Sequence, residues 1–122
     1  MPWEFRSDLP IYTQLIAQIQ QRIITGQLQP GDRLPSVRDW AAEAGVNPNT
    51  MQRAMTEMER QGLVHSQRTA GRFVTEDEAV IRKLREDLAR TQVRDFLAAM
   101  GQLGFGPDEI AALIQKEGEN SL

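Results

Sequence analysis

The stretch of residues 35–60 constrains the fold of this chain most strongly, because its pattern is typical of two short helices joined by a tight turn. Ser36 is a residue type that caps helix N-termini, and Asp39, three residues later, is the acidic half of a capping box. Trp40, Ala41 and Ala44 then fall on one helical face. Gly45 suits the turn, since glycine adopts a positive φ without strain.

The second helix of this pair has its own start signal and one polar face. Asn47 provides a capping side chain, and the ring of Pro48 pre-sets φ for the first helical position. The apolar stripe comprises Met51, Ala54, Met55 and Met58. The outward face comprises Asn49, Thr50, Gln52, Arg53 and Thr56. These polar types hydrogen-bond base edges and phosphates, so the pattern predicts a DNA-recognition helix, although any two packed helices share the apolar spacing.

Two short strands are expected directly after this helix. Residues 63–66 and 72–75 are the predicted strands, and the polar residues 67–71 form the turn between them. A hairpin after a recognition helix is a wing, and Arg68 and Arg72 lie close to its tip. The two arginines are therefore placed to reach a DNA backbone or minor groove; a solvated turn is the alternative.

The N-terminal part predicts one more helix and an arm. Apolar residues at helical spacing predict a helix from about Pro10 to Gly26; they are Tyr12, Leu15, Ile16, Ile19 and Ile23. Trp3 and Phe5 precede it in a short lead. This lead can pack as an extended arm on its own domain or on a partner subunit.

The C-terminal part predicts two helices, over residues 76–101 and from Pro107 onward. The first has two apolar stripes that point in different directions, the earlier one comprising Val80, Ile81, Leu84 and Leu88. We expect the earlier stripe to dock on the DNA-binding domain and the later one to bind a second subunit; a kink near Thr91 is the alternative. The predicted dimer interface comprises Val93, Phe96, Leu97, Met100, Ile110, Leu113 and Ile114.

Composition narrows the class of protein. The chain of 122 residues contains no cysteine, which excludes disulfides and thiolate metal sites, and we expect neither a metal nor a cofactor. A signal-peptide pattern and a membrane-spanning apolar run are both absent, so a cytoplasmic protein without a membrane partner is expected.

The net charge of −3 is unevenly distributed along the chain. Residues 1–75 hold eight arginines against seven acidic residues, whereas residues 76–122 hold six basic and ten acidic residues. A net charge of +1 on the predicted DNA-binding part gives only a weak electrostatic attraction to DNA phosphates. We therefore expect modest DNA affinity for one subunit, which makes dimerisation important.

Two other classes of function compete with DNA binding. An enzyme is disfavoured because the single histidine, His65, lies in a predicted wing strand and the glycine-rich run 101–106 lacks the spacing of a phosphate loop. A protein–protein interaction module without direct DNA readout remains the alternative. The polar outward face, which has no aromatic residue, favours DNA.

Three motifs together resemble the GntR family of bacterial transcriptional regulators: residues 29–38, residues 45–50, and residues 59–63 followed by the wing. The short C-terminal segment resembles the YtrA-type subfamily, which lacks a large effector-binding domain. The resemblance implies a regulator, usually a repressor, that binds palindromic operators as a homodimer. The sequence departs from the family pattern at two wing positions. A glycine is common in the family where this chain has Thr69, and a small hydroxyl residue is common where it has Arg72.

The sequence thus predicts a mainly α fold with a small β-wing. A winged helix-turn-helix over residues 1–75 is followed by a short two-helix dimerisation segment over residues 76–122. A small-molecule effector is possible but not identified by the sequence. By position, the resemblance implies DNA contacts at Arg38, Asn47, Asn49, Thr50, Gln52, Arg53, Arg68 and Gly71, and the predicted DNA-binding residues also include Arg33, Ser36 and Arg72.

Overall fold

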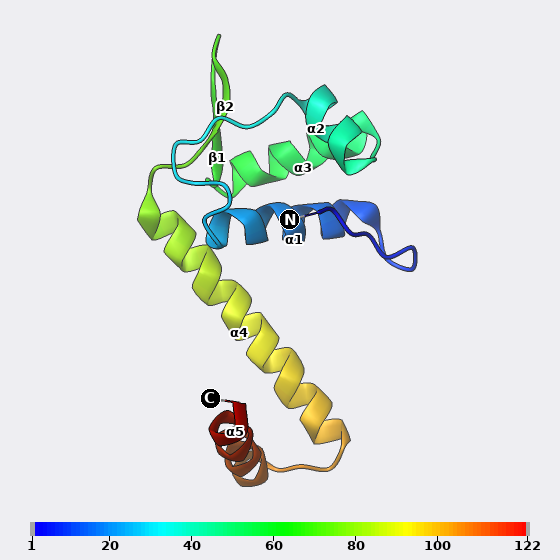
Figure 1. Ribbon diagram of the computed structural model, residues 1–122, viewed down its shortest axis with the longest axis vertical. Coiled ribbons are helices and arrows are strands. Elements are labelled where there is room, and N and C mark those ends of the chain that lie inside the picture. The colour runs from blue at the N-terminus through cyan, green and yellow to red at the C-terminus, as the bar shows by residue number, and fades with distance from the viewer. Residues whose placement is uncertain (1, 122) are drawn as a thin grey trace. The chain divides into compact units, whose positions relative to one another are not determined.

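The computed structural model describes residues 2–121, which form helices and one small antiparallel sheet (Figure 1). In chain order the elements are α1 (Ile11–Ile24), α2 (Val37–Ala44), α3 (Pro48–Arg60), β1 (Val64–Gln67), β2 (Gly71–Val74), α4 (Glu78–Gln102) and α5 (Pro107–Ser121). The predicted mainly α fold with a small β-wing is confirmed. The chain divides into two compact units, one ending at Leu84 and one beginning at Arg85, so that α4 contributes to both.

The helix-turn-helix has the predicted caps at Ser36, Gly45 and Asn47. The Ser36 hydroxyl oxygen accepts a hydrogen bond from the Asp39 backbone N–H at 3.1 Å. Gly45 ends α2 with a φ of 72°, which is the left-handed conformation expected of a glycine there. The Asn47 carbonyl oxygen Oδ1 accepts from the Asn49 N–H at 2.8 Å at the start of α3. These local interactions fix where α2 ends and where α3 begins.

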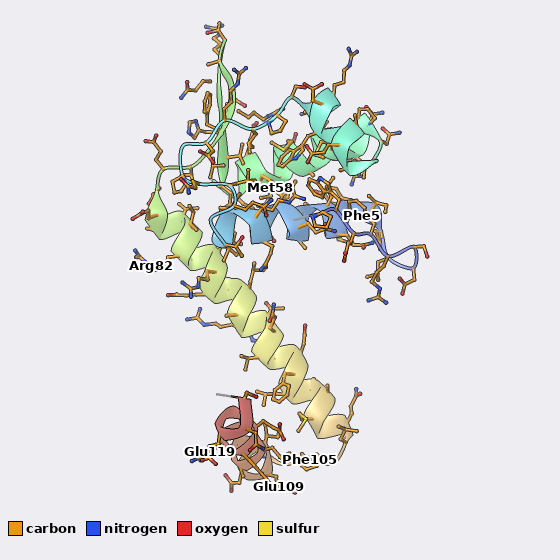
Figure 2. The ribbon with its side chains drawn as sticks, viewed as in Figure 1. Phe5, Met58, Arg82, Phe105, Glu109 and Glu119 are labelled. Carbon is orange, nitrogen blue, oxygen red and sulfur yellow. The ribbon has the colours of Figure 1, made fainter. Side chains whose placement is uncertain are left out.

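The core of the first unit lies among α1, α2 and α3. Leu15 and Ile19 of α1 are fully buried, as is Met58, which lies between α3 and α1 (Figure 2). Trp40 and Ala41 of α2 are also buried. The first turns of α4 add Val80, Ile81 and Leu84, which pack against this core. Leu88, the fourth residue of the earlier predicted stripe, instead belongs to the second unit.

The wing strands are each shifted by one residue from the predicted ranges, and the end of α3 explains where β1 begins. Gly62 has a φ of 78°, and the N–H of Leu63 bonds the Met58 carbonyl at 3.0 Å. This is the Schellman pattern, which assigns Leu63 to the end of α3. β1 therefore begins at Val64, which pairs with Val74 of β2.

The linker between α1 and α2 runs along the free edge of β2. The Gly31 N–H bonds the Val74 carbonyl at 3.0 Å, and the Val74 N–H bonds the Asp32 carbonyl at 2.9 Å. The Leu34 N–H bonds the Arg72 carbonyl at 2.9 Å. These bonds satisfy the second edge of a short strand and tie the wing to the helical core.

The N-terminal arm packs on its own unit. The rings of Trp3 and Trp40 meet edge to face at a centroid distance of 5.8 Å, and the Arg22 guanidinium carbon lies 3.7 Å from the centroid of Trp3. The Gln18 side chain also pairs with the Glu4 backbone, donating to its carbonyl at 2.6 Å and accepting from its N–H at 3.2 Å. The arm thereby connects α1 to α2.

The second unit contains the rest of α4 and all of α5. The chain is helical throughout residues 78–102, including at Thr91. At the start of α5, the Glu109 carboxylate accepts a hydrogen bond from the Gly106 N–H at 3.2 Å, and Ile110 is buried. Across residues 2–121, each helix is too short or too polar to cross a membrane.

Candidate nucleic-acid interface

The recognition helix α3 presents a polar face to solvent. Asn49, Gln52 and Arg53 are exposed, whereas Met51 and Met55 on the other side of the helix are buried in the core. Gln52 donates from Nε2 to the Thr56 hydroxyl at 3.3 Å, and that hydroxyl donates to the Gln52 backbone carbonyl at 3.0 Å. The apolar side of α3 therefore anchors the helix and leaves amide and guanidinium groups available to a ligand.

A shallow hollow of about 400 Å³ adjoins this face where α3 meets α1. Within it the Arg53 guanidinium carbon lies 4.3 Å from the centroid of the Tyr12 ring, and Arg60 pairs with Glu57 at 2.5 Å. The Arg60 hydrogen bond lowers the pKa of Glu57. Sequence reasoning placed Tyr12 only in the core stripe of α1. Its contact with a predicted DNA-binding arginine depends on how the two helices pack.

Two predicted contact residues lie at the start of α2. Arg38, in the first turn, is exposed. The Ser36 hydroxyl caps the helix, so its oxygen already accepts one backbone hydrogen bond. Ser36 thus shapes this end of α2, and Arg38 supplies the charge there.

The structure brings Arg33 and Gly71 together at the wing. Arg33 forms an isolated β-bridge with Phe73, and its Nε would lie 3.3 Å from a Cβ added at Gly71. Gly71 has a φ of 106°, which strains any other L-residue. The Arg33 side chain therefore rests directly on the wing backbone. A side chain at Gly71 would crowd it.

The wing turn closes without the additional family glycine. The Ala70 N–H bonds the Gln67 carbonyl at 3.1 Å, which closes a four-residue β-turn. Among residues 2–121, every residue with positive φ is a glycine, so Thr69 is accommodated at negative φ. Arg68 is exposed in this turn.

The two wing arginines have different surroundings. Arg72 donates from Nε to the Glu59 carboxylate at 2.6 Å, and the Ser66 hydroxyl donates to the same oxygen at 2.7 Å. Burial opposes ionisation of Glu59, but the hydrogen bonds from Arg72 and Ser66 and the charge of Arg72 outweigh it, so the pKa of Glu59 lies below its ordinary value. Sequence reasoning missed Glu59, because its pairing depends on the register of the hairpin against α3.

Comparisons with known proteins agree with this geometry. Residues 11–74 match the family model of bacterial regulatory proteins of the gntR family. The chain is 41% identical over 107 residues to the Bacillus subtilis protein YhcF, an uncharacterised HTH-type transcriptional regulator, and the match covers 88% of each chain. It is 42% identical over 72 residues to the Bacillus subtilis transcriptional repressor YtrA, covering 59% of this chain and 55% of YtrA.

Solved structures show the same fold. A GntR-family regulator from Listeria monocytogenes has a TM-score of 0.85 at 37% identity, covering 92% of this chain and 98% of that one. The AraR DNA-binding domain, solved in complex with the operator ORX1, has a TM-score of 0.55 at 27% identity and covers 62% of this chain and 99% of its own. The protein therefore belongs to the GntR family of bacterial transcriptional regulators, with a winged helix-turn-helix as its DNA-binding domain.

Proposed function

We propose that this protein is a transcriptional repressor that binds an inverted-repeat operator as a homodimer. The observation that carries the proposal is the exposed polar face of α3, which lies on a domain similar to one solved with its operator. Asn and Gln side chains pair with adenine, and Arg pairs with guanine. We assign Asn49, Gln52 and Arg53 to base edges or helix alignment, and Asn47 and Thr50 to phosphate.

Residues at the two ends of this surface complete the proposed DNA interface. Arg38 at the start of α2 is assigned to a phosphate or a guanine edge, and Ser36 supports that helix end. Arg33, Arg68 and Gly71 form the proposed wing contact. The function is therefore one of binding rather than catalysis, and we place it in the cytoplasm, where a bacterial operator is located.

Dimerisation is proposed to use the second unit. Its exposed apolar side chains include Val93, Phe96, Leu97 and Ile114, which are between 42% and 55% exposed. A groove of about 490 Å³ between α4 and α5 is lined by Phe96, Met100, Leu113, Ile114 and Glu117. A second copy of the chain would remove this apolar surface from water, which is favourable in proportion to the area buried.

Ile110 has a different place from the one its spacing predicts. It is only 4% exposed, so it packs inside its own protomer and its side chain is unavailable to a partner. We therefore propose that Ile110 supports the dimer face and does not contact the partner. In this proposal residues 1–75 bind DNA and residues 76–122 dimerise, with the first turns of α4 also packed on the DNA-binding core.

Selection of bound sequences from a random double-stranded DNA library tests the proposal. We expect enrichment of one sequence with inverted half-sites whose centres lie about one DNA turn, roughly 34 Å, apart. Failure to enrich any sequence would favour the alternative of a protein–protein interaction module.

Replacing Arg38 by alanine is expected to weaken binding to the selected DNA by about 1–3 kcal/mol. If Arg38 contacts phosphate, the slope of log K against log salt should shrink by about one unit. Fluorescence anisotropy at several salt concentrations measures both quantities. Arg82→Ala is the matched control, because exposed Arg82 lies on α4, outside the proposed interface (Figure 2). Unchanged affinity for Arg38→Ala at every salt concentration would remove Arg38 from the interface.

Replacing Gln52 by alanine is expected to change sequence preference as well as affinity. Loss of a bidentate amide contact removes about 1–3 kcal/mol of discrimination at one base pair. Repeating the selection with Gln52→Ala should relax one symmetric position of the preferred site. Arg82→Ala is again the control, since it removes an exposed side chain on α4, outside the proposed interface, and should leave the preferred site unchanged. An identical preferred site would show that Gln52 does not read bases.

A further inference from the structure

We propose that Glu59 and Arg72 form a clamp that positions the wing relative to the recognition helix, and that Arg72 acts through this clamp rather than by contacting DNA. This inference rests on the proposed DNA-binding function and revises one of its predicted contacts. Arg72 was expected at the DNA interface from its place near the wing tip. The structure instead shows its Nε bonded at 2.6 Å to a carboxylate of α3.

The clamp joins three elements through one carboxylate. Glu59 lies in the last turn of α3, Ser66 in β1 and Arg72 in β2, and both wing side chains donate to the same Glu59 oxygen. Ser66 and Arg72 are also directly paired in the hairpin register. One carboxylate on α3 therefore binds both strands at a single rung of the hairpin.

The setting of this ion pair makes it more effective than a surface salt bridge. The side chains of Arg72 and Glu59 are 25% and 32% exposed, so solvent screens their attraction only in part. Hydrogen bonds between charged groups are also stronger than neutral ones. By contrast, Arg60 on the same helix is 74% exposed and pairs with Glu57 within one helical turn, so that pair ties α3 only to itself.

The contact depends on the length of the Arg72 side chain. A small hydroxyl residue at this position of β2 would be too short to make the contact that Arg72 makes through Nε. The charge that Arg72 adds to the wing is matched by the carboxylate that holds it. Arg68 and Arg33 then remain as the wing arginines available to phosphate.

The consequence for recognition is geometric. A wing that is fixed to α3 reaches DNA at a set distance from the base pairs that the recognition helix contacts. Without the clamp, the two-stranded hairpin keeps its linker bonds and the buried side chains of Val64 and Val74 at its base. The rung of Ser66 and Arg72, nearer the tip, loses its contact with α3, and part of the binding free energy is spent on ordering it. Glu59 and Arg72 are therefore positioning residues.

Three variants test the clamp: Glu59→Ala, Arg72→Ala and the double variant. In the free protein, hydrogen exchange of the amides of residues 64–67 and 71–74 should accelerate in each variant, while that of α1 and α2 stays unchanged. Alanine favours helices, so Glu59→Ala leaves the helical propensity of α3 intact. Glu57→Ala is the matched control, because it removes a carboxylate from the same helix and should not alter exchange in the wing.

Binding to the selected DNA gives the second measurement. Each single variant should bind about tenfold more weakly, the double variant should bind no more weakly than the singles, and the salt slope should equal that of the unchanged protein. Arg68→Ala should instead reduce the slope by about one unit. A reduced slope for Arg72→Ala, or equal or tighter binding by Glu59→Ala, would overturn the proposal.

The two measurements separate failure of the clamp from failure of the proposed function. If the unchanged protein binds no selected DNA, the proposed function fails, and so does the role of the clamp in recognition. Unchanged wing exchange in the free variants would refute the clamp itself, whatever the DNA result. Faster exchange with unchanged DNA affinity would show that wing position does not matter for binding, which also contradicts the proposal.

Discussion

Replacing Phe96 and Leu97 together by glutamate is expected to convert the protein to monomers and to weaken operator binding by about 100-fold or more. Both side chains are more than 40% exposed in the second unit. Two charges on this face would have to be buried without partners in a dimer, which costs several kcal/mol. The loss of affinity follows because two linked subunits bind the second half-site at a high effective concentration. Light scattering and anisotropy measure the two effects.

The matched control for this change is Ala98→Glu. Ala98 is exposed in the same helix, and its spacing places it on nearly the opposite face from Val93 and Met100. The Ala98→Glu variant should remain dimeric and bind the operator with little change in affinity. If the variant with glutamate at both Phe96 and Leu97 stays dimeric at tens of micromolar, the apolar stripe that contains these two residues must have another partner. Monomers that retain full operator affinity would show that dimerisation does not determine binding.

Replacing Trp40 by alanine is expected to lower the free energy of unfolding by about 3–5 kcal/mol. Trp40 is 2% exposed and meets Trp3 edge to face, so the change leaves a cavity between α2 and the N-terminal arm. Urea denaturation followed by circular dichroism measures the loss. Because α2 precedes the recognition helix directly, operator binding should fall at temperatures where the variant is partly unfolded.

Trp3→Ala is the control for this site. Trp3 is half-buried, and its indole N–H donates to the exposed Glu43 carboxylate at a long distance of 3.4 Å, so its removal should cost less than that of Trp40. A loss below about 1 kcal/mol for Trp40→Ala would mean that the site collapses around the smaller side chain. The packing account of α2 would then be wrong.

Local signals predicted the helix-turn-helix well. Ser36, Gly45 and Asn47 each determine a helix end through atoms within three residues, so their types alone predict the caps found in the structure. The same holds for the apolar stripe of α3, because burial of Met51 and Met55 follows from helical spacing. The wing strands were predicted to within one residue, and the Schellman turn at Leu63 accounts for the later start of β1.

Features that depend on tertiary packing were not predictable in this way. The pair between Glu59 and Arg72 spans thirteen positions and requires the hairpin to fold back on α3 in one register. The stacking of Arg53 on Tyr12 depends on the packing of α1 against α3. Periodicity shows that Ile110 is apolar, but it could not show that Ile110 is buried within its own protomer, because that depends on how α5 packs.

The most direct test of the account is the mass of the complex formed with selected operator DNA. Sedimentation equilibrium should find two protomers on one inverted repeat, and Phe96→Glu with Leu97→Glu should abolish this complex at the same concentration. The unchanged protein should also bind a duplex with a single half-site much more weakly. One protomer bound tightly to the full operator, with equal affinity for the single half-site, would contradict the proposed mechanism.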